Sequence, residues 1–326
     1  MTDEQNFPSD SEYIIIPNPI YDVVFRYLME DPESAMIVLS TLINEKITSL
    51  QLRTHRQNRS INPIHRRKPS TKDDLRLFHL EFDAIIHWTD GKVESVIIEL
   101  QKSTQTGDIH RFKRFLIQNQ HKAKENYMLP ESNPANENSG RLIRIFILSF
   151  RIENEINDLM INSNVAKTGV FKNKQLAVSN EFIDKLDKDF IVVQLPNLSQ
   201  IAESEYEHVE YKKQLFALLK LFDQNSKVKH NDHRLRLVRS FFPISIKPVI
   251  NRLQWAIADF YEIDEHMFAE DEHLRHLISQ DNLIAFYQNK LEFLEEQEQV
   301  SKTKKQIEIE LKKESALITE LTRTIK

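Results

Sequence analysis

The chain has 326 residues with 40% hydrophobic content, which is enough to bury a sizeable core in one large domain or two modest ones. The absence of cysteine excludes disulfides, thiolate zinc sites and cysteine nucleophiles, while only 4 glycines and 11 prolines argue against a low-complexity chain. The formal net charge of -5 is mildly unfavourable for a whole-chain nucleic-acid binder, so the distribution of charge matters more than its sum.

The sequence contains no recognisable membrane-spanning segment or signal peptide. No apolar run is long enough to cross a bilayer, and MTDEQNFPSD lacks the basic start and apolar stretch of a signal peptide. We therefore expect a cytoplasmic protein without a membrane partner, beginning with a flexible segment over residues 1–12. The apolar run at 13–16 is expected either to add an edge strand or to pack under the first helix.

Two helices and a strand are predicted next. Asn18 before a proline, and Asp31 before another, are good helix starts because Asn and Asp cap and proline suits the first turn. A strand follows at 47–52. Asp22 lies off the centre of the first helix's apolar stripe, so it is either a solvated acid favoured by the helix dipole or a carboxylate delivered to a site.

A basic segment follows over residues 53–72. It contains seven Lys or Arg, two His and no acid, and it has no hydrophobic period. Such a run is either an exposed loop or an arm that grips phosphates, because Lys and Arg release counterions when they neutralise a nucleic-acid backbone. The nucleic-acid contacts predicted here are Arg53, Arg56, Arg59, Arg66, Arg67 and Lys68.

Residues 75–102 are predicted to form a long antiparallel hairpin around Asp90-Gly91, because Asp-Gly between two alternating apolar runs is a strong hairpin signal. The side-chain period of a strand is two, so Glu99 and Gln101 share one face. If Asp83 pairs near Glu99, two carboxylates converge beside an amide, which begins a site for a hard divalent cation. The alternative interpretation is that these acids simply form the solvent-exposed face of an antiparallel sheet.

The remaining elements follow in chain order. A helix is predicted at 108–127, where Arg111 and Arg114 either reach substrate phosphate or form a solvated basic face, and a loop follows at 129–140. Nearly continuous apolar strands are predicted at 142–150 and 190–195. Residues 201–297 read as helical, and the charged tail 298–326 is either a short coiled coil, through which the chain could form a homo-oligomer, or an amphipathic helix.

Three motifs together resemble the PD-(D/E)XK nuclease superfamily, in particular its recombination-promoting nuclease and putative transposase branch. They are an opening helix with Asp22 and Phe25, an acid followed by Glu-x-Gln at Asp83, Glu99 and Gln101, and a late strand ending before Leu195-Pro196 in which Gln194 replaces the usual acid. The resemblance covers roughly residues 18–198. It implies an α/β restriction-endonuclease-like core over residues 13–200, with a central mixed sheet flanked by helices, followed by an α-helical C-terminal region.

The resemblance also implies a Mg²⁺- or Mn²⁺-dependent endodeoxyribonuclease acting on DNA in mobile-element or recombination biology. Asp83 and Glu99 would bind the ion, with the Leu100 carbonyl as a third ligand and Asp22 as a further catalytic acid. Gln101 stands where the superfamily carries a lysine; an amide can orient water but adds no positive charge. The alternatives are a catalytically weak or inactive nucleic-acid-binding assembly protein on the same scaffold, and RNA rather than DNA as substrate.

Overall fold

The computed structural model forms two compact units, which are described separately. The first consists of residues Met1–Arg56 and Leu77–Met267, and the second of Gln57–Arg76 and Phe268–Lys326. The structure describes residues 12–53, 78–103, 141–152, 156–163, 167–175, 189–229, 231–258, 263–272 and 307–316, with isolated positions between 183 and 290. Within the second unit, residues 307–316 are helical. No helix in these described stretches is both long enough and apolar enough to cross a membrane.

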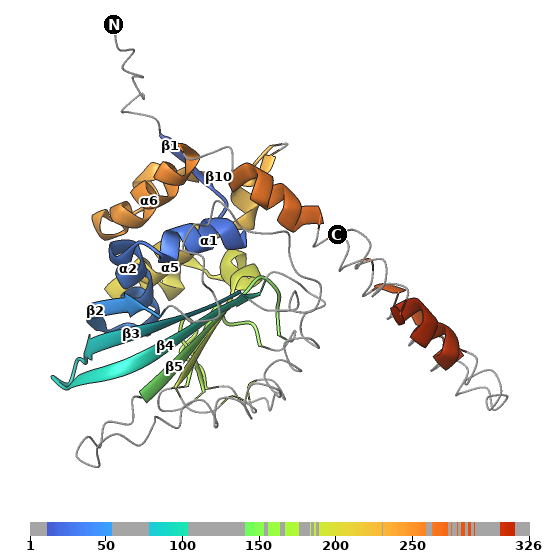
Figure 1. Cartoon of the computed structure of the whole chain (residues 1–326). Coiled ribbons are helices and arrows are strands. Elements are labelled where there is room, and N and C mark those ends of the chain that lie inside the picture. The colour runs from blue at the N-terminus through green and yellow to red at the C-terminus, as the bar shows by residue number, and fades with distance from the viewer. Residues whose placement is uncertain are drawn as a thin grey trace, which may run out of the picture. The chain divides into compact units, whose positions relative to one another are not determined.

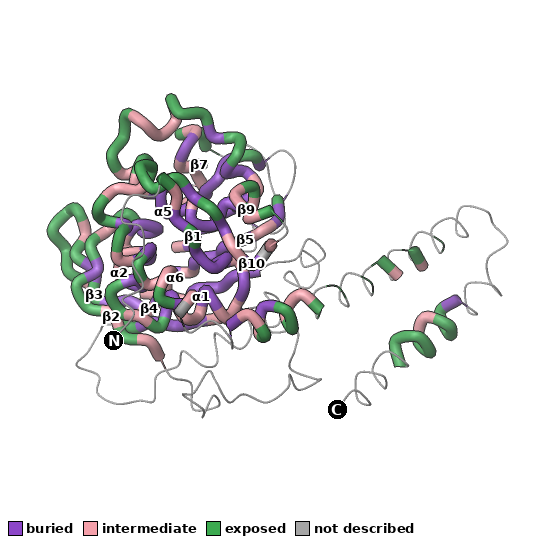
Figure 2. The backbone as a smooth tube through the Cα atoms, turned by 90° about the horizontal axis from the view of Figure 1, so that it is seen from above, coloured by how far each residue is buried: buried purple, intermediate pink, exposed green. Residues whose placement is uncertain are grey.

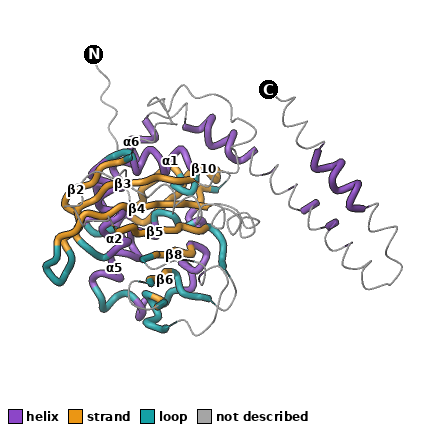
Figure 3. The backbone as a smooth tube through the Cα atoms, turned by 60° about the horizontal axis from the view of Figure 1, so that its bottom comes forward, coloured by secondary structure: helices purple, strands orange, loops and turns teal. Residues whose placement is uncertain are grey.

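A seven-stranded mixed sheet forms the centre of the first unit, in the order β2-β3-β4-β5-β8-β6-β7 (Figures 1 and 3). The first three strands are antiparallel neighbours, β4, β5 and β8 run parallel, and β6 returns antiparallel to β8. Their bounds are β2 Lys46–Leu52, β3 Phe78–His87, β4 Val93–Ser103, β5 Arg141–Leu148, β6 Met160–Asn162, β7 Thr168–Gly169 and β8 Phe190–Gln194. The chain is therefore of the mixed α/β class expected from its sequence.

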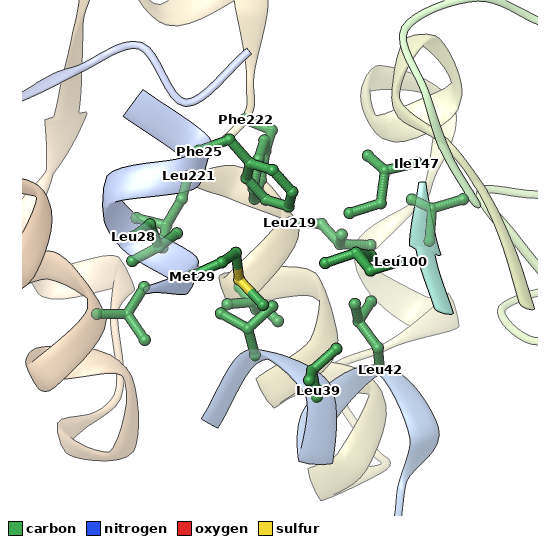
Figure 4. Packing of buried hydrophobic residues seen from close by; sticks show 14 of the residues in the cluster. Phe25, Leu28, Met29, Leu39, Leu42, Leu100, Ile147, Leu219, Leu221 and Phe222 are labelled. Carbon is green, nitrogen blue, oxygen red and sulfur yellow. The ribbon is translucent and has the colours of Figure 1, made fainter. Parts of the chain in front are cut away.

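Three helices cover one face of this sheet: α1 (Asp22–Met29), α2 (Pro32–Ile43) and α5 (Glu210–Lys220). Figure 4 shows Phe25, Leu39 and Leu219 meeting Leu100 and Ile147 from the strands. This is the larger hydrophobic cluster, and its burial is the main favourable term for folding the unit. Figure 2 shows the buried segments gathered inside the unit.

The opposite face of the sheet is divided into two halves. Towards β5, β8 and β6 it carries a second apolar cluster, which includes Phe146, Phe190 and Val192. Towards β2, β3 and β4 the same face carries polar side chains instead. The second half of β5, residues 145–148, is buried on both faces and is a continuous apolar run, as predicted for a central parallel strand.

A second, three-stranded sheet corrects one prediction. Strand β10 (Asn231–Val238) pairs antiparallel with β1 (Tyr13–Pro17) and with β9 (Lys227–Val228), although residues 201–297 were expected to be helical throughout. Leu235 and Val238 are three residues apart, as on one face of a helix, whereas the buried residues here are Leu235 and Leu237, which follow the period of two of a strand. Short apolar runs fit both periods, and the partner strand β1, which lies more than 200 residues earlier in the chain, selects the strand.

The pairing of β1 with β10 also bears on the expected domain boundary near residue 200. Helix α6 (Lys247–Ala258) packs on α1, α2 and β1, and α5 belongs to the main hydrophobic cluster. The first compact unit therefore continues to Met267 and does not divide at residue 200. The apolar run at 13–16 is an edge strand of the small sheet, one of its two expected roles.

The N-terminus of α2 is as predicted. Asp31 is its N-cap, and its side chain accepts a hydrogen bond from the Ser34 amide at 2.9 Å, with Pro32 in the first turn. Burial alone raises the pKa of Asp31, but the hydrogen bonds from Ser34 and the charge of Arg252 lower it overall below the ordinary 3.8. The ionised carboxylate is therefore the form that stabilises the helix.

We expect Asp31→Ala to lower the free energy of unfolding by about 1 kcal/mol at neutral pH, because an orphan amide of the first turn loses its acceptor. Asp31→Asn should retain most of the stability. Since the folded pKa is depressed, the advantage of Asp over Asn is present above pH 3.8 and is lost as the pH falls through the folded pKa. Urea unfolding at neutral and acidic pH measures both effects, and equal stability of all three proteins at neutral pH would contradict the assignment.

Candidate functional site

The register of the β3–β4 hairpin determines which side chains meet on the polar half of the sheet face opposite α1 and α2. His87 pairs with Val93, so the connection contains five residues and its Gly91 takes a φ of 86°. This register places Glu81 directly opposite Glu99 and His79 opposite Gln101. Residues opposite each other in an antiparallel pair point to the same face. The four side chains therefore project together from the face not covered by α1 and α2.

Neighbouring strands extend this row with two arginines. On β5, Arg144 is in register with Glu99. At the end of β2, the amide of Arg53 donates to the Glu81 carbonyl at 2.8 Å. One line across four strands thus reads Arg53, Glu81, Glu99, Arg144. Two acids face each other at its centre and a permanent cation stands at each end.

Glu99 is the most heavily contacted of these acids. Its Oε1 accepts a hydrogen bond from Gln101 Nε2 at 2.6 Å and lies 3.2 Å from His79 Nε2, and its Oε2 accepts from Arg144 Nε at 3.1 Å. Burial alone raises the pKa of Glu99, but the hydrogen bond and charge of His79, the charge of Arg144 and the bond from Gln101 lower it overall below 4.5. Glu99 is therefore ionised at neutral pH.

Under the alternative interpretation Glu81 would face water with His79 and Asp83, but it is buried, with 8% of the residue exposed. Its Oε1 lies 3.5 Å from His79 Nε2. Two carboxylates directly opposite in a sheet repel each other, and this pair is further removed from water than surface acids are. Such an arrangement lowers the stability of the fold unless nearby cations offset the repulsion. Opposed acids of this kind are therefore candidates for a functional site.

Gln101 adds a second observation independent of the acids. The residue is only 3% exposed, and its Nε2 is bound to Glu99. Its carboxamide Oε1 is buried and has no hydrogen-bond partner among the described residues. A buried acceptor without a partner is costly, so it suggests a missing donor or cation.

The structure separates Asp83 from the position expected for it. Asp83 is on the same face as Glu99 but pairs with Ile97, two residue pairs from the Glu81–Glu99 pair, so Asp83 and Glu99 are diagonal rather than opposite. Its Oδ1 accepts from Arg53 Nε at 2.8 Å and Nη2 at 2.6 Å. Opposing Asp83 to Glu99 would require a shift of two residues in one strand. The acid from β3 that meets Glu99 is Glu81.

Asp22 is not part of this group. Its carboxylate lies 2.6 Å from the Nζ of Lys102, and Lys102 points to the helix-covered face, opposite to Glu99 and Gln101. The Lys102 side chain is fully buried, donates to the Ile20 carbonyl and lies 5.8 Å from the centre of the Phe25 ring. Asp22 therefore anchors α1 to β4, which corrects the idea that the opening helix delivers it to the acids.

The other predicted residues fall into two groups. Leu100 is buried in the main hydrophobic cluster, in register with Leu80 and Ile145, and a carbonyl in such an interior strand is ordinarily used in the ladder. The remaining predicted contacts lie outside the described residues: Arg56, Arg59, Arg66, Arg67, Lys68, Arg111 and Arg114. Of the predicted basic contacts, only Arg53 is described, and it faces the site.

Gln194, at the end of β8, has a structural role. Its Nε2 donates to the Ile156 and Asp158 carbonyls at 3.0 Å each, and its Oε1 accepts from the Ile152 amide at 2.9 Å. The residue is fully buried. An amide suits this place because it both donates and accepts, which an ionised acid cannot do.

The site can be assessed as a cation site from these contacts. Glu81, Glu99 and the Gln101 Oε1 offer two carboxylates and one amide oxygen, and Mg²⁺ is commonly held by one or two carboxylates with waters completing its shell. Within the described part of the chain, no group of three or more His, Asp or Glu is arranged to hold a metal ion. The donors fit a largely hydrated hard cation better than a fully enclosed one.

Comparisons with known proteins provide no further guide: no family model matches the chain, and neither the curated proteins nor the solved structures contain a match.

We expect Asp22→Ala to lower the free energy of unfolding by about 2 kcal/mol, because a buried ammonium loses its charged partner. Lys102→Met in the same background should recover much of that loss, since it removes the uncompensated charge. The two single variants and the double variant, compared by urea unfolding, measure the coupling. Additive effects of the two substitutions would contradict the pairing.

Proposed function

We propose that this protein is a Mg²⁺- or Mn²⁺-dependent endonuclease that hydrolyses phosphodiester bonds in DNA. The observation that carries the proposal is that the largely buried Glu81 and Glu99 lie opposite each other beside the Gln101 Oε1, which has no hydrogen-bond partner in the described part of the chain. The resemblance to the PD-(D/E)XK nucleases supports it, since that resemblance implies a restriction-endonuclease-like mixed sheet and a role in mobile-element or recombination biology.

Each residue of the site has a definable task. Glu81 and Glu99 would hold the cation, which when bound supplies positive charge and lowers the pKa of its water. Arg144 and Gln101 fix the orientation of the Glu99 carboxylate through their hydrogen bonds. The Gln101 Oε1 can accept a hydrogen bond from a water and so orient it. Gln101 adds no positive charge, and Arg144 is the permanent cation closest to that position in register.

Access to the site runs from the side of β2. The Gln101 and Glu81 side chains are buried, whereas Arg53 and Asp83 are 34% and 49% exposed. A phosphate approaching along this gradient meets a guanidinium first and the acid pair behind it. Arg is well suited to that first contact because its planar fork binds phosphate oxygens in pairs.

We expect Glu99→Gln and Glu81→Gln each to weaken Mn²⁺ binding by about a hundredfold and to abolish nicking of plasmid DNA, because either change removes half of the charge that holds the cation. Calorimetric titration with Mn²⁺ and a plasmid assay with Mg²⁺ measure the two effects. Parallel digestion of DNA and RNA identifies the substrate.

Glu94→Gln is the matched control, because Glu94 is on the same strand but points to the other face, where it binds Trp88 Nε1. It should bind Mn²⁺ and nick DNA like the unmodified protein. Equal binding and nicking in all four proteins would eliminate the proposed site. DNA binding without Mn²⁺ binding would favour a non-catalytic assembly protein.

A further inference from the structure

The face that carries the acid pair also holds a third carboxylate, Asp83, which is bound to Arg53. Asp83 pairs with Ile97, two residue pairs from the Glu81–Glu99 pair, and lies on the same side of the sheet. Its Oδ1 accepts hydrogen bonds from Arg53 Nε at 2.8 Å and from Arg53 Nη2 at 2.6 Å. A diagonal position in a hairpin is within reach of long side chains, and Glu99 is long. Asp83 is therefore a carboxylate within reach of the acid pair whose charge is compensated by Arg53.

This ion pair is the most exchangeable contact of the site. Its members are 34% and 49% exposed, whereas Arg144 and Glu99 in the neighbouring pair are 18% and 14% exposed. Exposed Arg–Asp pairs contribute little net stability, because water screens their charges. A phosphate diester offers the guanidinium the same paired oxygens as a carboxylate does, so it can replace Asp83 on Arg53.

We infer that Arg53 is a positioning residue that couples the binding of a nucleic-acid phosphate to the binding of the cation, an inference that rests on the proposed function. When a phosphate takes Arg53, Asp83 loses its compensating charge beside two further carboxylates. The three acids then face less positive charge, and the cation is bound more tightly. Because such coupling is reciprocal, the cation also favours phosphate binding by the same factor.

The same exchange would keep cation binding weak when no nucleic acid is bound. With Arg53 on Asp83, only two carboxylates meet, which agrees with the lack of a three-acid metal group among the described residues. The complete set of acids assembles only when a phosphate backbone is present. A nuclease built this way holds its cation most firmly with substrate in place.

The test is a Mn²⁺ titration of the full chain with and without a short phosphorothioate DNA duplex, corrected for the Mn²⁺ taken up by the duplex alone. The duplex should tighten Mn²⁺ binding about tenfold in the unmodified protein. Arg53→Gln should bind Mn²⁺ about that much more tightly without DNA and should gain less than about twofold from the duplex. Asp83→Asn should show neither the tighter binding nor the gain.

Arg141→Gln is the matched control, since Arg141 holds Asp189 through bonds of 2.6 and 3.0 Å elsewhere in the sheet. It should keep the tenfold gain, and thermal melting of each variant confirms folding. Full coupling in Arg53→Gln or in Asp83→Asn would overturn the inference while leaving the cation site intact. Failure of the unmodified protein to bind Mn²⁺ under either condition would overturn the proposed function and the inference together.

Discussion

The register of the β3–β4 hairpin is the constraint on which the rest of the site depends. A connection of five residues sets every pair along the two strands, and it brings Glu81 opposite Glu99. A shift by a single residue would send one strand's polar side chains into the main hydrophobic cluster, because the side-chain period is two. The apolar residues of β3, such as Phe82, therefore fix the register and with it the meeting of the acids.

The two faces of the sheet have different roles. One face, under α1, α2 and α5, supplies the burial that stabilises the unit, and a buried cation on that face, Lys102, is held by Asp22 and the Ile20 carbonyl. The other face carries a row of charged side chains in which two adjacent acids, Glu81 and Glu99, lie between two arginines. Lys102 and Gln101 are neighbours in sequence yet serve opposite faces, so the nearest lysine in the chain cannot act beside Glu99.

In the charged row, repulsion between the two acids is offset by attraction to neighbouring cations, so the ion pairs are not independent. Two largely buried carboxylates in register repel each other, and the described arginines beside them are Arg144 at one end and Arg53 near the other, with the His79 ring between. Arg53 with Asp83 is more open to solvent than Arg144 with Glu99, so we expect it to contribute less net stability. Exchange at that pair changes the charge felt by the others, which is how one surface arginine can influence a buried site.

By itself the sequence determined the elements whose signals are local. Asp31 before a proline marked the start of α2, Asp-Gly marked the hairpin, and the continuous apolar run at 142–150 marked a central strand, because capping, turn geometry and burial act over a few residues. It also placed Glu99 and Gln101 on one face, since alternation follows from strand geometry alone.

Only the tertiary structure decided which strands pair and which side chains meet. Pairing of β10 with β1 joins segments separated by more than 200 residues, and the choice of Glu81 over Asp83 depends on the number of residues in the turn. The side on which Asp22 lies depends on how α1 packs against the sheet, because long-range pairing and packing are set by the whole core and leave no local trace in the chain.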